Sequence, residues 1–137
     1  MATLLAHVTV RPGAEARFEE IARELWERTH ADEPAVRHYE YWRGSDSRTY
    51  YTLVSYPDHR SFISHQASDH HESAVHQLGD VVEHIRLEWL DPVEGASDLP
   101  PTAMQSAPPD ADDLVRSHTD RYAAVIAAWW PARPIER

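Results

Sequence analysis

The order of its strand-like and helix-like patterns constrains the fold of this chain more than any other sequence feature. Four segments alternate between two faces with a period of two and are rich in β-branched and aromatic residues: residues 3–10, 36–43, 48–56 and 84–91. Only residues 44–47, Gly-Ser-Asp-Ser, separate the second segment from the third. A connection this short predicts a hairpin, so these two strands should pair antiparallel.

Helical patterns fill the intervals between these segments. Residues 14–29 place apolar side chains every three or four positions, as an amphipathic helix does, and Pro34 prevents its continuation. Asp58 can cap a short helix over residues 59–65, and Asp69 can start a longer one over residues 70–82. The resulting order, β-α-β-β-α-β, predicts an α+β fold of the ferredoxin-like type with a four-stranded antiparallel sheet.

The chain changes character after this unit. We divide it into a barrel-like domain over residues 1–93, a proline-rich acidic linker over residues 94–112, and an amphipathic helix over residues 113–131. The helix carries aromatic residues, among them Tyr122 and Trp129, that should not be left in water. We therefore expect it to pack on its own domain or on a partner subunit.

The composition excludes several classes of function. The formal charge is −10, which disfavours nucleic acid and anionic membranes as partners. The chain has no lysine and no cysteine, so Schiff-base chemistry, thiolate nucleophiles and disulfides are excluded. No apolar run approaches the ~20 residues of a membrane span, and residues 1–10 do not resemble a signal peptide. A cytoplasmic protein is the prediction.

Residues 56–76 hold five of the ten histidines, namely His59, His65, His70, His71 and His76. They form either the wall of a functional pocket or a compositional accident. His71 and His76 are five positions apart, about 500° around a helix, so they do not match the zinc-protease spacing. A site using His65 with His70 or His71, plus Asp69, remains an alternative, but the favoured interpretation has no metal.

Four further expectations concern single residues. His59 and His76 should face solvent. Trp26 is expected to anchor the first helix in the core, and Trp89 should lie either in the core or on the barrel surface of a dimer.

Four stretches carry a resemblance to a known family: V-T-V-R-P-G at 8–13, F-E-E-I-A-R-E-L at 18–25, E-P-A-V-R-H-Y-E at 33–40 and F-I-S-H-Q-A-S-D-H-H at 62–71. Together, and in this order, they resemble the antibiotic biosynthesis monooxygenase superfamily of dimeric α+β barrels. The resemblance covers roughly residues 3–92. It implies a homodimer in which two four-stranded sheets meet on one face, and a pocket in each subunit between the sheet and its helices.

The resemblance also implies an activity. Some members oxidise aromatic phenols, anthrones or quinols with dioxygen and no cofactor, which predicts a small aromatic substrate of polyketide or quinol type. Residue by residue, the family pattern places His65, Ser68 and His70 at the site, with His71 as an alternative to His70. Such an enzyme needs a base to make the substrate anion, and His65, His70 or His71 could supply it. The side chains expected to bind the flat ring are Tyr39, Trp42, Tyr51, Phe62 and Arg86.

The sequence departs from the family pattern at several positions. Ala35 stands where a glycine is frequent, and Val54 and Tyr56 stand where a Glu and a Trp are frequent. Other members bind and degrade haem, but this chain lacks the asparagine of that branch. The alternatives are therefore a non-catalytic barrel that binds a hydrophobic ligand, a haem-binding variant, and a cyclase-like activity.

Overall fold

The structure, a computed structural model, describes residues 1–129 of the 137-residue chain, with side chains up to residue 123. The elements are β1 (Ala2–Val10), α1 (Glu15–Asp32), β2 (His38–Arg43), β3 (Thr49–Tyr56), α2 (His59–Gln66), α3 (Asp69–Leu78), β4 (Val82–Trp89) and α4 (Asp113–Trp129). The first seven follow the ferredoxin-like order, with the second helical segment divided in two. The predicted fold class is therefore confirmed.

The four strands form one antiparallel sheet in the order β2-β3-β1-β4. The central strand β1 pairs with β3 and β4, so that Leu4 lies opposite both Val54 and Trp89. Alternate residues of β1, beginning with Ala2, are buried, and the residues between them are more exposed except for Thr3. This alternation means that the sheet has one face in the core.

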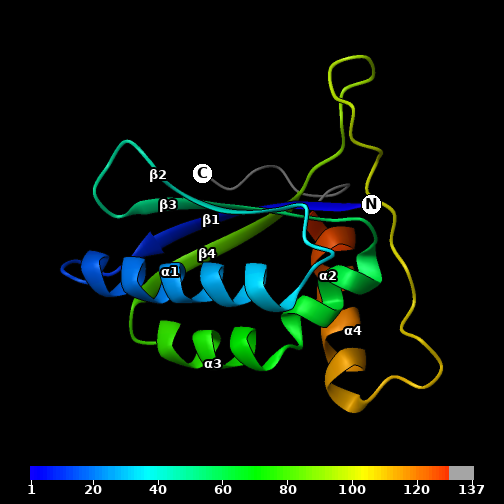
Figure 1. The fold of residues 1–137 in the computed structure, drawn as a ribbon. Coiled ribbons are helices and arrows are strands. Elements are labelled where there is room, and N and C mark those ends of the chain that lie inside the picture. The colour runs from blue at the N-terminus through cyan, green and yellow to red at the C-terminus, as the bar shows by residue number, and fades with distance from the viewer. Residues whose placement is uncertain (130–137) are drawn as a thin grey trace.

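All four helices lie on the same side of the sheet (Figure 1). The long helix α1 buries one stripe against it, made of Phe18, Ile21, Ala22, Leu25 and Thr29. The opposite face of the sheet has no helix over it among residues 1–129 and carries half-buried side chains such as Leu5, His7, Tyr51 and Leu53.

Local sequence signals fix the entrances to the helices. Gly13 takes a φ of +82°, which a residue without Cβ adopts easily, in the turn between β1 and α1. The Asp58 carboxylate accepts a hydrogen bond of 2.8 Å from the backbone N–H of Ser61 and caps α2. Ser68 caps α3, and its hydroxyl also donates to the carbonyl of His65 at 2.6 Å. The Ser68 side chain therefore ties the end of α2 to the start of α3.

The segment after β4 first projects away from the sheet and then runs along α2 before it reaches α4 (Figure 1). Thr102 donates from its hydroxyl to the Leu90 carbonyl at 2.8 Å. The helix α4 packs on α2 and β4, with the Tyr122 ring 5.2 Å from that of Phe62 and His118 2.6 Å from Glu72 of α3. The predicted last residues of this helix, 130 and 131, lie outside the described residues. None of the described helices is long and apolar enough to cross a membrane.

The structure corrects three local predictions. The helix expected over residues 70–82 ends at Leu78, because Gly79 disfavours helix. The next strand, β4, already begins at Val82. His59 is 1% exposed rather than facing solvent, because the chain around residue 105 covers it. Trp26 is 44% exposed rather than anchored in the core. Two further single-residue expectations are confirmed, since His76 is exposed and Trp89 is buried.

Candidate functional site

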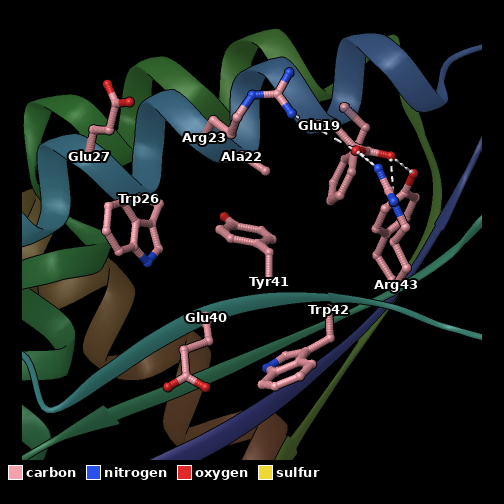
Figure 2. Close-up of a pocket in the computed structure, with 11 residues that line it drawn as sticks. Glu19, Ala22, Arg23, Trp26, Glu27, Glu40, Tyr41, Trp42 and Arg43 are labelled. Atoms are coloured by element: carbon pink, nitrogen blue, oxygen red, sulfur yellow. Dashed lines mark hydrogen bonds and ion pairs between the residues drawn. The ribbon is translucent and has the colours of Figure 1, made fainter.

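A cavity of about 800 Å³ lies between α1 and the edge strand β2. Five aromatic side chains line it: Phe18, Trp26, Tyr41, Trp42 and Tyr50. Figure 2 shows Tyr41 pointing from β2 toward the helix, with Trp26 beside it and Trp42 on the other side of the strand. The cavity is therefore a largely aromatic space that opens at the edge of the sheet.

The helical wall of this cavity follows from residue spacing on α1. Phe18, Ala22 and Trp26 are four residues apart, so they lie on one face of the helix. Ala22 stands between the two aromatic residues and has only a methyl group. The small side chain at this position leaves room that a larger residue would fill.

One end of the cavity is closed by a charged network. The Arg43 guanidinium donates to both carboxylate oxygens of Glu19, at 2.5 and 3.1 Å, and the Tyr50 hydroxyl donates to the same carboxylate at 2.7 Å. The hydrogen bond from Arg43 is the main cause that lowers the pKa of Glu19. Burial and the bond to Glu19 raise the pKa of Tyr50 to about 12. Both oxygens of Glu19 are thus occupied as acceptors.

A pair of phenols connects the cavity to the interior. The Tyr41 hydroxyl lies 3.0 Å from that of Tyr39, which is buried beneath it. Burial raises the pKa of Tyr41 to about 12, so it remains a neutral phenol at physiological pH. When Tyr39 donates to Tyr41, the Tyr41 proton is free to bond a ligand in the cavity.

A second group of polar side chains gathers around Glu33. One carboxylate oxygen, Oε2, lies 2.7 Å from His65 Nδ1 and 2.5 Å from His70 Nε2. The other oxygen accepts a hydrogen bond of 2.7 Å from the Tyr56 hydroxyl. We refer to Glu33, Tyr56, His65 and His70 as the Glu33 cluster.

Four different elements bring the Glu33 cluster together. Glu33 is the residue that follows the last turn of α1, where Pro34 stops the helix. Tyr56 ends β3, His65 lies in the last turn of α2, and His70 lies in the first turn of α3. The close connection between α2 and α3 therefore places both imidazoles against one carboxylate.

The carboxylate at the centre of this cluster is ionised. Burial alone would raise the pKa of Glu33, but the hydrogen bond and charge of His65, with the bonds from Tyr56 and His70, lower it to about 2. An ionised carboxylate only accepts hydrogen bonds, so the facing imidazole nitrogens carry the protons.

His71 lies beside the cluster but is not bonded to Glu33. Its ring packs against that of His65 at 4.8 Å. Burial, with the neighbouring His65, lowers the pKa of His71 to about 3, so its imidazole is neutral. Its buried Nδ1 has no hydrogen-bond partner among the described residues.

The predicted catalytic histidines are not in the wall of the aromatic cavity. His65 is 1% exposed, and the Tyr39 ring packs against it at 4.9 Å, on the path to Tyr41. His70 opens instead into a second cavity, of about 250 Å³, between α1 and α3. His65 does not line the aromatic cavity, because an aromatic side chain of β2 covers it, and its role at a substrate site stays a prediction. A haem in the larger cavity would also find no imidazole among the residues that line it.

The residues predicted to bind the substrate ring are scattered. Trp42 lines the cavity, whereas Phe62 is fully buried in the core against Trp89. Tyr51 and Arg86 lie on the opposite face of the sheet, next to His7. Of these five predicted residues, only Trp42 lines this cavity, although Tyr39 supports Tyr41 from below.

Sequence reasoning missed Glu33, Tyr41 and Trp26. Glu33 belongs to the Glu-Pro motif before the second strand, and by itself this motif indicates only the family. Tyr41 shares the period-two face of Tyr39, so alternation could have linked the two phenols. The four-residue spacing from Phe18 to Trp26 predicts an apolar face of the helix, but it does not show whether that face meets the core or a cavity.

Comparison with known proteins identifies the family. The profile of the family described as antibiotic biosynthesis monooxygenase matches residues 1–77, which is more than half of the chain. The chain belongs to this family. No curated protein matches it.

Several solved structures share the fold. A family protein from Caulobacter crescentus CB15 is 25% identical, with a TM-score of 0.64, and the match covers 68% of this chain and 90% of that one. A putative antibiotic biosynthesis monooxygenase from Nitrosomonas europaea is 14% identical, with a TM-score of 0.64, and the match covers 68% of this chain and 99% of that one. Rv0793 from Mycobacterium tuberculosis is 20% identical, with a TM-score of 0.63, and the match covers 70% of this chain and 98% of that one. This antibiotic biosynthesis monooxygenase family protein thus has about 30% of its length outside each match.

Proposed function

We propose that the cavity between α1 and β2 binds a flat aromatic molecule of polyketide or quinol type, and that the protein oxidises it with dioxygen without a cofactor. The observation that carries the proposal is the cavity itself, whose wall has five aromatic side chains. Of its two phenol hydroxyls, that of Tyr50 is bonded to Glu19, and that of Tyr41 is backed by the buried phenol of Tyr39. Aromatic walls with a few placed polar groups are typical of sites for small aromatic ligands.

The chemistry requires a substrate anion. Deprotonation of an anthrone C–H gives a carbanion that passes one electron to dioxygen, and the resulting radical and superoxide combine to form a C–O bond. The peroxide takes up a proton, and loss of water with the second C–H proton leaves a carbonyl, so one substrate and one dioxygen give one ketone and one water. The protein has to accept the first proton and stabilise the anion.

The lining residues offer both functions. The neutral Tyr41 hydroxyl donates a hydrogen bond to the developing oxyanion of the substrate, with Tyr39 holding its oxygen. The carboxylates of Glu27 and Glu40 line the cavity and can accept the substrate proton. In this proposal His65 is a positioning residue, because it packs against Tyr39 and does not reach the substrate.

Oxygen uptake tests the proposal. Purified protein mixed with anthrone or a naphthohydroquinone should consume one dioxygen per substrate, and Tyr41→Phe should slow the reaction. The single variants Glu27→Gln and Glu40→Gln, and the double variant, identify the base. If wild-type protein consumes no oxygen above the background of the substrate alone, the oxidase proposal fails.

A second candidate is a binding protein without turnover. It is favoured by the absence of any imidazole from the described lining of the cavity, since histidine is the usual general base near neutral pH. Trp26 and Trp42 report on this cavity, so a bound aromatic compound should quench their fluorescence. Quenching that saturates without oxygen uptake would select this candidate over the oxidase.

We also propose that two copies associate through the face of the sheet that the described helices leave uncovered. Leu5, Tyr51 and Leu53 on this face remain partly exposed in the single chain, although they belong to the two central strands. A second copy would remove them from water. Light scattering after size-exclusion chromatography should give twice the mass of the 15.7 kDa chain, and Leu53→Glu should return it to a single chain.

A further inference from the structure

We propose that Glu33, His65 and His70 form a binding site for one divalent transition-metal ion, of the zinc, cobalt, nickel and ferrous-iron class. One donor atom from each residue lies within 4.8 Å of the other two. Two imidazoles and one carboxylate are ligands that these ions prefer over calcium or magnesium. This site is separate from the aromatic cavity, so the inference does not rest on the proposed function.

The geometry is close to what such an ion requires. Metal–ligand bonds of about 2.1 Å place neighbouring ligand atoms roughly 3.0–3.4 Å apart. The Glu33 oxygen is now 2.7 Å from His65 Nδ1 and 2.5 Å from His70 Nε2. The carboxylate therefore has to withdraw by less than about 1 Å for an ion to replace the two shared protons. The two imidazole nitrogens lie within 4.8 Å of each other, and the ion has to bring them to the same spacing. Glu33 lies just beyond the end of α1, where a side chain has room for this shift.

The surroundings hold the ligands in place. The Tyr56 hydroxyl bonds the Glu33 oxygen that would not bind the ion, and so fixes the plane of the carboxylate. The rings of Tyr39 and Tyr56 pack against His65 at 4.9 and 5.5 Å. Ligands that are oriented by outer partners bind a metal more tightly than free side chains do.

His71 provides an independent observation. When His65 binds an ion through Nδ1, its proton moves to Nε2 and needs an acceptor. The His71 ring packs edge-to-face against His65, and its buried Nδ1 is an acceptor without a partner among the described residues. A buried ring nitrogen without a partner is costly. The two rings would have to shift from their present packing for the Nε2 proton of a metal-bound His65 to reach it.

The second cavity supplies a route for the ion. It has a volume of about 250 Å³, lies between α1 and α3, and includes His70 in its wall together with the acidic residues Glu24 and Asp69. Arg28 also lines this cavity, but the two carboxylates outnumber it and favour the entry of cations over anions. Three protein ligands leave at least one position open, and water from this cavity can fill it.

A titration with cobalt tests the site directly. Protein freed of metal by dialysis against a chelator should bind one Co²⁺ per chain and develop visible absorption bands, and Zn²⁺ should remove these bands by competition. Glu33→Gln and His70→Gln should each weaken binding at least tenfold. The matched control is His38→Gln, which breaks the exposed His38–Glu40 pair and should leave the titration unchanged.

Three results would overturn the inference. They are the absence of stoichiometric Co²⁺ binding, binding that survives in both Glu33→Gln and His70→Gln, and binding that falls equally in His38→Gln. Circular dichroism in the presence of chelator shows whether each variant folds, and the His70→Gln titration decides if Glu33→Gln does not fold. Since metal binding is read without substrate, its failure is distinct from a failure of oxygen uptake.

Discussion

The aromatic cavity and the Glu33 cluster lie on the two sides of Tyr39 and differ in almost every physical respect. The cavity is large and apolar, and the Tyr41 hydroxyl can keep a proton free for a ligand. In the cluster, both oxygens of a partly buried carboxylate are occupied by three donors. Two of the three histidines predicted to be catalytic, His65 and His70, thus belong to a bonded interior cluster, whereas the cavity to which we assign the substrate is lined by aromatic residues of α1, β2 and β3.

The largest expected effect is on the cluster. The pKa of Glu33 is about 2 in the folded chain against an ordinary 4.5, so its ionised form stabilises the fold above pH 4.5, and this contribution is lost as the pH falls from 4.5 to 2. Glu33→Gln should therefore lower the free energy of unfolding at pH 7 by about 3 kcal/mol. Its stability should also change less than that of wild type across this acid range. Urea unfolding at several pH values measures both effects.

The control for this prediction is Glu83→Gln, which removes an exposed ion pair with Arg48 and should cost less than about 1 kcal/mol. Equal losses in the two variants would mean that the Glu33 cluster is no more important to the fold than a surface pair. The Glu33 cluster would then not differ from the rest of the molecule as a stabilising interior network.

The next largest effect is expected in the cavity. Tyr41→Phe removes the one hydroxyl that the proposal assigns to the substrate anion, and the rate of oxygen uptake should fall about thirtyfold, or about 2 kcal/mol. Tyr51 lies on the opposite face of the sheet, so Tyr51→Phe should leave the rate within about twofold. A larger fall in Tyr51→Phe than in Tyr41→Phe would place the substrate on the opposite face.

The sequence predicts the fold well but the site only in part, and the reason is physical. The order of the elements follows from periodicity, which each segment shows by itself. The Glu33 cluster depends on contacts between residues 32 and 37 positions apart, which no local pattern reveals. Trp26 satisfies the apolar period of its helix whether it meets a core or a cavity, so its exposure could not be foreseen.

A smaller effect should follow from filling the cavity. Ala22→Leu adds three carbon atoms between Phe18 and Trp26, so a bound anthrone should be held about tenfold more weakly, or about 1.4 kcal/mol. The matched variant Ala16→Leu makes the same change at an exposed position of α1 and should bind as wild type does. Fluorescence titration measures both. Unchanged binding in Ala22→Leu would show that the ligand does not occupy this space.

The smallest effect concerns His71 and the polarity of the interior. The pKa of His71 in the folded chain is about 3, below the ordinary 6.5. Between these pH values the unfolded chain binds a proton at His71 and the folded chain does not, so the free energy of unfolding falls as the pH drops from 6.5 toward 3. Between pH 7 and 5.5 this amounts to about 1 kcal/mol. His71→Leu should remove that part of the pH dependence, whereas His76→Leu, at an exposed position of α3, should retain it. If both variants keep the wild-type slope, His71 is charged in the folded chain, and it could not accept the proton of a metal-bound His65.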